Sequence, residues 1–156
     1  MVLMSAYVVR RAPRYPKVES KCVRSMADAM LRRLDLFDAE LSVLLTDDET
    51  IRRLNREHCH KDRATDVLSF HFDSVHAPVS AAAPRLLGDI VISLDTAVRH
   101  ANGRRRPLLE ELRWLLAHGI LHLLGFDHAE ATQKKEMDAW TRRLVRAAPI
   151  AALNPR

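Results

Sequence analysis

The hydrophobic residues of this chain recur with two periods, one typical of β-strands and one typical of amphipathic helices. Short apolar runs that are β-branched or alternate with polar residues predict four strands, at 6–10, 41–45, 66–72 and 88–93. Apolar residues that recur every three or four positions predict five helices, which begin near residues 16, 46, 94, 107 and 130. The segment 73–87 contains two prolines and an alanine-serine run, so we expect a loop there.

Local sequence signals indicate where several of these helices begin and end. Pro16 suits the first turn of a helix, because its missing N–H has no partner there anyway. Thr46 and Glu49 form a capping box that opens the second helix, which should end near His58. The Asn102-Gly103 pair ends the third helix.

The alternation of strands and helices predicts an α+β fold with α/β-like character, a small mixed sheet with helices packed around it. Periodicity does not give the order of the strands. The helix that begins at Pro107 carries an apolar stripe, and apolar residues also flank the opposite face, so it is hydrophobic nearly all round. We therefore expect it to be the buried central helix. The stripe consists of Leu112, Leu116, Ile120 and Leu123.

The length of 156 residues predicts one domain over 1–150, followed by a loose C-terminal tail over 151–156. Hydrophobic residues make up 47% of the chain and charged residues 29%, and no apolar run approaches the roughly 18 residues of a membrane span. The stretch Met1–Tyr7 lacks the pattern of a secretory signal, so the expected location is the cytoplasm. The two cysteines, Cys22 and Cys59, fit free thiols in a reduced compartment. A net charge of +5 favours a polyanionic partner but decides little alone.

Three histidines within eleven residues form the main candidate site. His118 and His122 are four residues apart, which places both rings on one face of a helix. Gly125 is the residue type best able to end that helix in a left-handed conformation, and the turn can return His128 as a third ligand. A lone histidine on an apolar helix is usually a core residue, but this spacing is harder to reach by chance. The pattern therefore predicts a metal site.

Three protein nitrogens that leave one position open are typical of catalytic rather than structural zinc sites. Zinc is the expected metal, one ion per chain, although nickel, copper, cobalt and ferrous iron accept the same ligands. An ion in an open site lowers the pKa of a water towards about 7 and polarises a phosphoryl oxygen. Asp127 is a candidate catalytic residue that would orient an imidazole or the water, although an aspartate after a helix is often only part of a turn.

The histidine spacing also matches the zinc-binding run of metzincin peptidases, H-E-x-x-H-x-x-G-x-x-H. This chain has Gly119 where those peptidases carry the glutamate that acts as general base. A positioned base contributes about 10²- to 10⁴-fold in rate. A peptidase would therefore need a carboxylate from elsewhere in the fold.

The stretch 118–128, HGILHLLGFDH, closely resembles the signature of the YbeY family of bacterial single-strand endoribonucleases, and Gly119 belongs to that signature. The stretches 54–70 and 87–93 resemble two further family segments, L-N-x-x-[YF]-R-x-K-[DN]-x-x-T-[DN]-V-L-S-F and L-G-D-I-x-I-S. The resemblance implies a four-stranded mixed sheet with the metal at one end. It also implies cleavage of single-stranded RNA, in maturation of the 3′ end of 16S ribosomal RNA and in ribosome quality control.

The resemblance breaks at two positions. The family's arginine, which lines the RNA cleft, is Cys59 here, and the aromatic residue before it is His58. Three nearby cations, Arg56, Lys61 and Arg63, are candidates for substrate binding through phosphate contacts, with solvated surface charge as the alternative. The remaining histidines share no spacing typical of metal ligands, so we expect each of them to be an ordinary surface or strand residue. They are His58, His60, His71, His76 and His100.

Three functions therefore remain open from the sequence. The favoured one is a metal-dependent endoribonuclease whose partner is single-stranded RNA, a 16S rRNA precursor or the small ribosomal subunit, with no membrane or DNA partner. The second is a zinc metallopeptidase with a displaced base. The third is a non-catalytic ribosome assembly factor that binds RNA and keeps zinc for stability. The chain has no Gly-x-Ser-x-Gly elbow and no glycine-rich phosphate loop, which disfavours serine hydrolases and nucleotide-binding enzymes.

Overall fold

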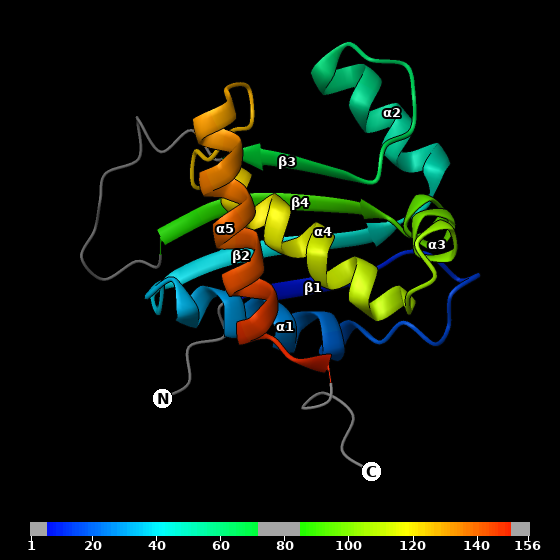
Figure 1. Cartoon of the computed structure of the whole chain (residues 1–156). Helices are drawn as coiled ribbons and strands as arrows, with labels where there is room; N and C mark the ends of the chain where they lie inside the picture. Colours follow the sequence, from blue (N-terminus) through cyan, green and yellow to red (C-terminus); the bar gives the residue numbers. More distant parts are fainter. Residues whose placement is uncertain (1–5, 72–84, 151–156) are drawn as a thin grey trace.

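The structure is a computed structural model that describes residues 6–71 and 85–150. Its strands are β1 (Ala6–Arg10), β2 (Ala39–Thr46), β3 (Val67–His71) and β4 (Arg85–Ser93). Its helices are α1 (Ser20–Arg33), α2 (Asp48–Cys59), α3 (Leu94–Gly103), α4 (Leu108–Leu123) and α5 (Ala131–Ala147). Four strands and five helices in the described residues confirm the predicted α+β class (Figure 1).

The strands form one mixed sheet in the order β1-β2-β4-β3. β1, β2 and β4 run parallel to one another, whereas β3 pairs antiparallel with β4. In that last pair Val67 lies opposite Ile92, and His71 lies opposite Gly88. The segment that joins α2 to β3 therefore lies at the sheet edge where β2 and β4 end.

Three helices, α1, α4 and α5, lie on one side of the sheet, where α1 and α4 contact strands and α5 packs on those two helices (Figure 1). The middle one, α4, contacts β3 and β4 as well as α1, α3 and α5. Leu112, Leu116 and Ile120 of α4 are fully buried, which confirms the predicted buried central helix. Because α4 is held on several sides, the residues on its remaining face have a fixed position relative to the sheet.

The predicted starts of two helices are wrong. α1 begins at Ser20 rather than near Pro16, because the preceding residues form a turn in which the Val18 N–H donates to the Tyr15 carbonyl. The predicted capping box also fails, because Thr46 still belongs to β2 and the N-cap of α2 is Asp47. The Asp47 carboxylate accepts from the Thr50 N–H at 2.9 Å.

The predicted loop over 73–87 is wrong at its C-terminal end, since Arg85–Leu87 belong to β4. These residues pair with β2 across a β-bulge, after which Leu41 lies opposite Gly88. Gly88 has φ +141°, and a Cβ there would lie 2.1 Å from the Phe70 carbonyl oxygen. Only glycine fits this close approach of β3. The rest of that loop, Phe72 of the predicted strand, and the tail 151–156 lie outside the described residues.

Candidate metal centre

The C-terminal half of α4 positions the first two histidines of the candidate site. The His118 and His122 rings lie on the same helix face, with their Nε2 atoms 2.9 Å apart. After the helix ends, Gly125 adopts φ +92°. Its N–H donates to the His122 carbonyl, and the Phe126 N–H donates to the Leu121 carbonyl. These two bonds form a Schellman motif, so the predicted left-handed stop at Gly125 is confirmed.

The turn after α4 brings the third histidine to the first two. One ligand atom each of His118, His122 and His128 lies within 4.8 Å of the other two. Nitrogens about 2.0–2.1 Å from a tetrahedral zinc ion would be roughly 3.3 Å apart, so small side-chain shifts suffice to bind an ion. Both helix histidines are half-buried and His128 is exposed. The three imidazoles can hold a metal with one side open to solvent.

The surroundings favour the neutral form of the two helix histidines. Burial lowers the pKa of His118, and the nearby His122 and His128 lower it further. Burial also lowers the pKa of His122, with His128 as the next cause. A neutral imidazole has a free lone pair, whereas a protonated one cannot bind a metal. The site is therefore prepared for a cation before one binds.

Close packing of α4 on the sheet fixes the distance between these histidines and the sheet. A Cβ built at Gly119 would lie 2.9 Å from Cδ1 of Ile90, and Ile90 is fully buried. The Ser69 hydroxyl on β3 donates to the Gly119 carbonyl at 3.2 Å. The position that carries glutamate in metzincins thus faces the sheet and has no room for a side chain.

Asp127 lies beside the third histidine and bonds to its backbone. Its carboxylate accepts from the His128 N–H at 2.7 Å, and the same oxygen is 3.9 Å from Nδ1 of His128. Both side chains are exposed. The contacts of Asp127 therefore fix the turn that carries His128.

The three predicted substrate-binding cations lie on or after α2, and all are exposed. Asn55, which is buried, donates from Nδ2 to the Arg63 carbonyl at 2.9 Å. Its own carbonyl accepts from the Lys61 N–H, beyond a left-handed His60. Asn55 thus ties the segment that carries Lys61 and Arg63 to α2. Arg56 lies one turn before the end of the helix.

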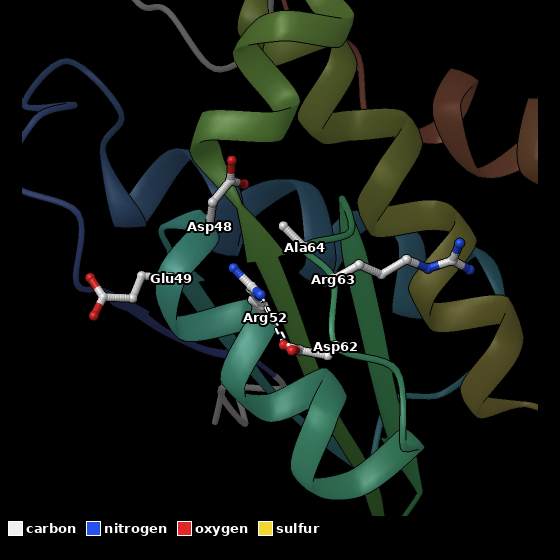
Figure 2. A pocket seen from close by; sticks show the side chains of 6 residues that line it. All are labelled: Asp48, Glu49, Arg52, Asp62, Arg63 and Ala64. Atoms are coloured by element: carbon white, nitrogen blue, oxygen red, sulfur yellow. Dashed lines mark hydrogen bonds and ion pairs between the residues drawn. The ribbon is translucent and has the colours of Figure 1, made fainter.

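This segment borders a shallow hollow of about 520 Å³ beside α2 (Figure 2). Arg52 and Asp62 turn toward each other there, with Nε and Oδ1 2.8 Å apart, while Arg63 points away from them. The Arg52 hydrogen bond lowers the pKa of Asp62. Arg56 also pairs with Asp62, at 3.7 Å, whereas Lys61 and Arg63 form no ion pair in the described part of the chain. Lys61 and Arg63 therefore have the more available charges.

The two residues that depart from the family pattern lie at the end of α2. Cys59 is an exposed free thiol. The His58 ring contacts Phe70 of β3 edge to face, with ring centroids 5.3 Å apart. His58 thus packs as an aromatic ring between α2 and the sheet, a contact that its polar side chain did not reveal in the sequence.

Sequence reasoning missed a second cleft, of about 330 Å³, that His118 helps to line. Its lining includes Asp66 before β3, Asp138 of α5, and Glu111 and Trp114 of α4. Both aspartates are close enough to raise the pKa of His118 against the effect of burial. One sequence signal could have revealed this cleft. Positions 111, 114 and 118 are three and four residues apart, so a helix places Glu111, Trp114 and His118 on one face. His71 of β3 also lies near the site, since it acts on the pKa of His122.

Among the described helices, none is long and apolar enough to cross a membrane.

Comparison with known proteins identifies the family. Residues 12–148 match the family model described as Endoribonuclease YbeY. Proteins named Endoribonuclease YbeY from Anaeromyxobacter dehalogenans and Myxococcus xanthus are 50% and 47% identical over 80% and 81% of this chain. The aligned part spans only 62% and 42% of those two relatives' own length.

A third relative of the same name, from Geobacter metallireducens, is 38% identical over 90% of this chain and 93% of its own. The solution structure of a Thermotoga maritima protein shares the fold, with a TM-score of 0.63, 24% identity, and coverage of 92% of this chain and 88% of that one. The family match extends over β2, β3 and β4, over α2, and over the three histidines. The chain belongs to the YbeY family.

Proposed function

We propose that this protein is a metal-dependent endoribonuclease that cleaves single-stranded RNA and acts in maturing the 3′ end of 16S ribosomal RNA. The observation that carries the proposal is the convergence of three imidazole nitrogens within 4.8 Å, in a chain whose relatives are named endoribonucleases. The 16S rRNA precursor or small ribosomal subunit is the proposed partner, with a role in ribosome quality control. The proposed location is the cytoplasm, and residues 1–150 are the proposed catalytic domain.

Zinc is the proposed metal, with His118, His122 and His128 as its ligands. The donor set supports this choice, since three neutral nitrogens and an open side are typical of catalytic zinc. When bound, the ion supplies charge stabilisation at a phosphoryl oxygen and makes water a better nucleophile near neutral pH. Asp127 would hold the backbone of His128 in place, so its proposed role is to position that ligand.

The protein's cations would bind the RNA backbone. Arg56, Lys61 and Arg63 are exposed on a segment that continues into Asp66 and Val67, which line the cleft beside His118. Guanidinium and ammonium groups contact phosphates through charge-assisted hydrogen bonds. A strand whose cleaved phosphate lies at the histidines would pass this segment.

The two alternative functions make different demands. A peptidase needs a general base, and position 119 has no room for one, so a carboxylate from elsewhere, such as Asp66 or Asp138 of the neighbouring cleft, would have to supply it. A non-catalytic RNA-binding factor needs no turnover and predicts RNA affinity that is unchanged by loss of turnover. No observation favours either alternative over RNA cleavage.

The test compares substrates on purified protein of defined metal content. A fluorescent single-stranded RNA, the same sequence as duplex, and casein are incubated with the wild type and with the His118→Ala variant. We expect cleavage of single-stranded RNA by the wild type alone. Casein cleavage that a chelator abolishes, with RNA intact, would replace the proposal with the peptidase.

A further inference from the structure

The cleft beside His118 contains a charged cluster built on one buried carboxylate. Glu111 of α4 is fully buried, and its Oε1 and Oε2 atoms bind Arg104 and Arg106. Burial of an unpaired carboxylate is strongly unfavourable, and the two guanidiniums pair with both oxygens of Glu111. One negative charge against two positive charges gives this cluster by itself an excess of one positive charge.

The two arginines differ in how much of each guanidinium remains available. Arg106 uses Nε and Nη2 on Glu111, lies 5.7 Å above the Trp114 ring, and its side chain is only 21% exposed. Arg104 uses Nη1 alone, and its side chain is 55% exposed. Arg104 therefore has free N–H donors that face solvent while one nitrogen is held in place.

The backbone that carries these arginines is fixed as well. The Arg104 N–H donates to the His100 carbonyl, and the Arg106 N–H donates to the Ala101 carbonyl, with Arg105 between them at φ +52°. Pro107 then caps α4. A guanidinium held by its carboxylate and by the chain loses little entropy when it binds a ligand, which is the condition for a preorganised anion contact.

The same cleft also has negative groups and an aromatic wall. Asp66 and Asp138 line it together with Trp114. Asp66 is partly engaged, since its Oδ1 accepts from the Val67 N–H and its Oδ2 lies 3.6 Å from Nδ1 of His100. A bare anion would meet both signs of charge here. A nucleotide can instead direct its phosphate to Arg104 and the donors of its base or ribose to a carboxylate.

We propose that this cleft binds the nucleotide next to the cleaved bond, with Arg104, which is paired with Glu111, holding its phosphate. The inference rests on the proposed function, because the position of the RNA strand follows from cleavage of a phosphate at the adjacent histidines. His118 lines the cleft, so a strand can run from the metal ligands into it without a break.

The experiment measures single-turnover cleavage of a short single-stranded RNA at increasing protein concentration and at several salt concentrations. Metal-loaded wild type is compared with Arg104→Ala, with Arg104→Lys, and with Arg142→Ala, a control that removes one exposed charge from α5. Anisotropy binding of the same RNA is measured in parallel, and thermal melting checks that each variant is folded.

We expect Arg104→Ala to raise the half-saturating protein concentration about tenfold, because the variant loses one charge-assisted hydrogen bond to the RNA. The maximal rate should stay within about twofold of the wild type. The magnitude of the slope of log affinity against log salt concentration should fall by about 0.7, which corresponds to the loss of one phosphate contact on a single strand. Arg104→Lys should keep that slope and recover only part of the affinity, because an ammonium cannot hold Glu111 and a phosphate as a fork does.

Two results would count against the inference in different ways. If the wild type cleaves RNA and Arg104→Ala matches Arg142→Ala in half-saturation and salt slope, the nucleotide subsite is overturned and the proposed function stands. If the wild type neither binds nor cleaves the RNA, the proposed function itself fails, and the subsite fails with it. Should Arg104→Ala not fold, Arg104→Lys decides, since unchanged half-saturation there also overturns the subsite.

Discussion

Gly119 of α4 lies directly against Ile90 of β4, and a Cβ at position 119 would lie 2.9, 3.1 and 3.2 Å from three side-chain atoms of that isoleucine. Ile90 is fully buried and cannot withdraw into solvent. The absence of a side chain at Gly119 therefore sets the distance between α4 and the sheet. That distance in turn places His118, which directly precedes Gly119, and His122, which follows it by three residues.

This contact predicts that Gly119→Ala destabilises the protein although alanine is the better helix former. The gain in helix propensity is about 1 kcal/mol, whereas overpacking typically costs about 1–3 kcal/mol. We expect a net loss of about 1 kcal/mol, and a larger loss for Gly119→Glu, measured by thermal unfolding.

Gly103 provides the matched control, since it ends α3 and a Cβ there would meet nothing within 4 Å. Gly103→Ala should be neutral or slightly stabilising. A Gly119→Ala variant that is as stable as Gly103→Ala would show that Ile90 does not restrict this position.

Asp48, at the start of α2, connects that helix to the start of α3. Its carboxylate accepts from the Ser93 and Thr96 hydroxyls, both at 2.6 Å, and from Arg99 at 2.9 Å. Burial raises the pKa of Asp48, but the three hydrogen bonds outweigh burial and leave this pKa below its usual value. The ionised carboxylate is thus the form that stabilises the fold.

A depressed pKa in the folded state gives a defined pH dependence. The stabilisation is fully present above the unfolded pKa of about 3.9 and is lost as the pH falls through the lower folded pKa. We expect Asp48→Asn to lower the stability by about 1–2 kcal/mol at pH 7. The gap from wild type should close below about pH 4, in chemical unfolding measured at several pH values.

Asp38, which is exposed, supplies the comparison for this series. Asp38→Asn should change the stability little at any of these pH values. A deficit of Asp48→Asn that persists unchanged into strong acid would mean that shape rather than charge explains the loss.

The parts of the fold that follow from local patterns could be predicted from the sequence. The stripe of α4, the i, i+4 pair His118 and His122, and the stop at Gly125 depend only on helix geometry and on glycine's conformational freedom. The cap of α2 was misplaced by one residue, because pairing of Thr46 with Ser93 across the sheet extends β2.

Long-range contacts could not be predicted in the same way. His58 contacts Phe70, and the His118 cleft joins Asp66 to Asp138, across parts of the chain that only the tertiary fold brings together. Glu111 looked like an ordinary charge in the first turn of a helix, yet it is fully buried against two arginines. Periodicity identifies the face of a helix but not the element that packs on it.

The exposed Cys59 marks the position where this chain lacks the arginine of the family pattern. An arginine there would donate a charge-assisted hydrogen bond to a phosphate or to the charge that develops during cleavage, and loss of one such donor costs about 10²- to 10³-fold. We expect Cys59→Arg to raise the single-turnover rate of RNA cleavage several-fold, with the metal content unchanged.

A neighbouring cation is the competing explanation at this position. If the rate of Cys59→Arg equals that of the wild type while Arg56→Ala or Lys61→Ala abolishes cleavage, that neighbour has taken over the contact. Cys59→Ser is the matched control, because it removes the thiol at the same exposed position without adding a charge. Cys22→Arg would be a poor control, because Cys22 is half-buried.

The central claim is that a metal ion bound by His118, His122 and His128 is what makes this protein cleave RNA. The most direct measurement titrates zinc into chelator-treated protein and records bound metal and the rate of single-stranded RNA cleavage on the same samples. We predict that the rate rises in proportion to occupancy and levels off at one ion per chain, and that each histidine-to-alanine variant loses both metal and cleavage. Full metal binding by all three variants, or undiminished cleavage by metal-free wild type, would contradict the claim.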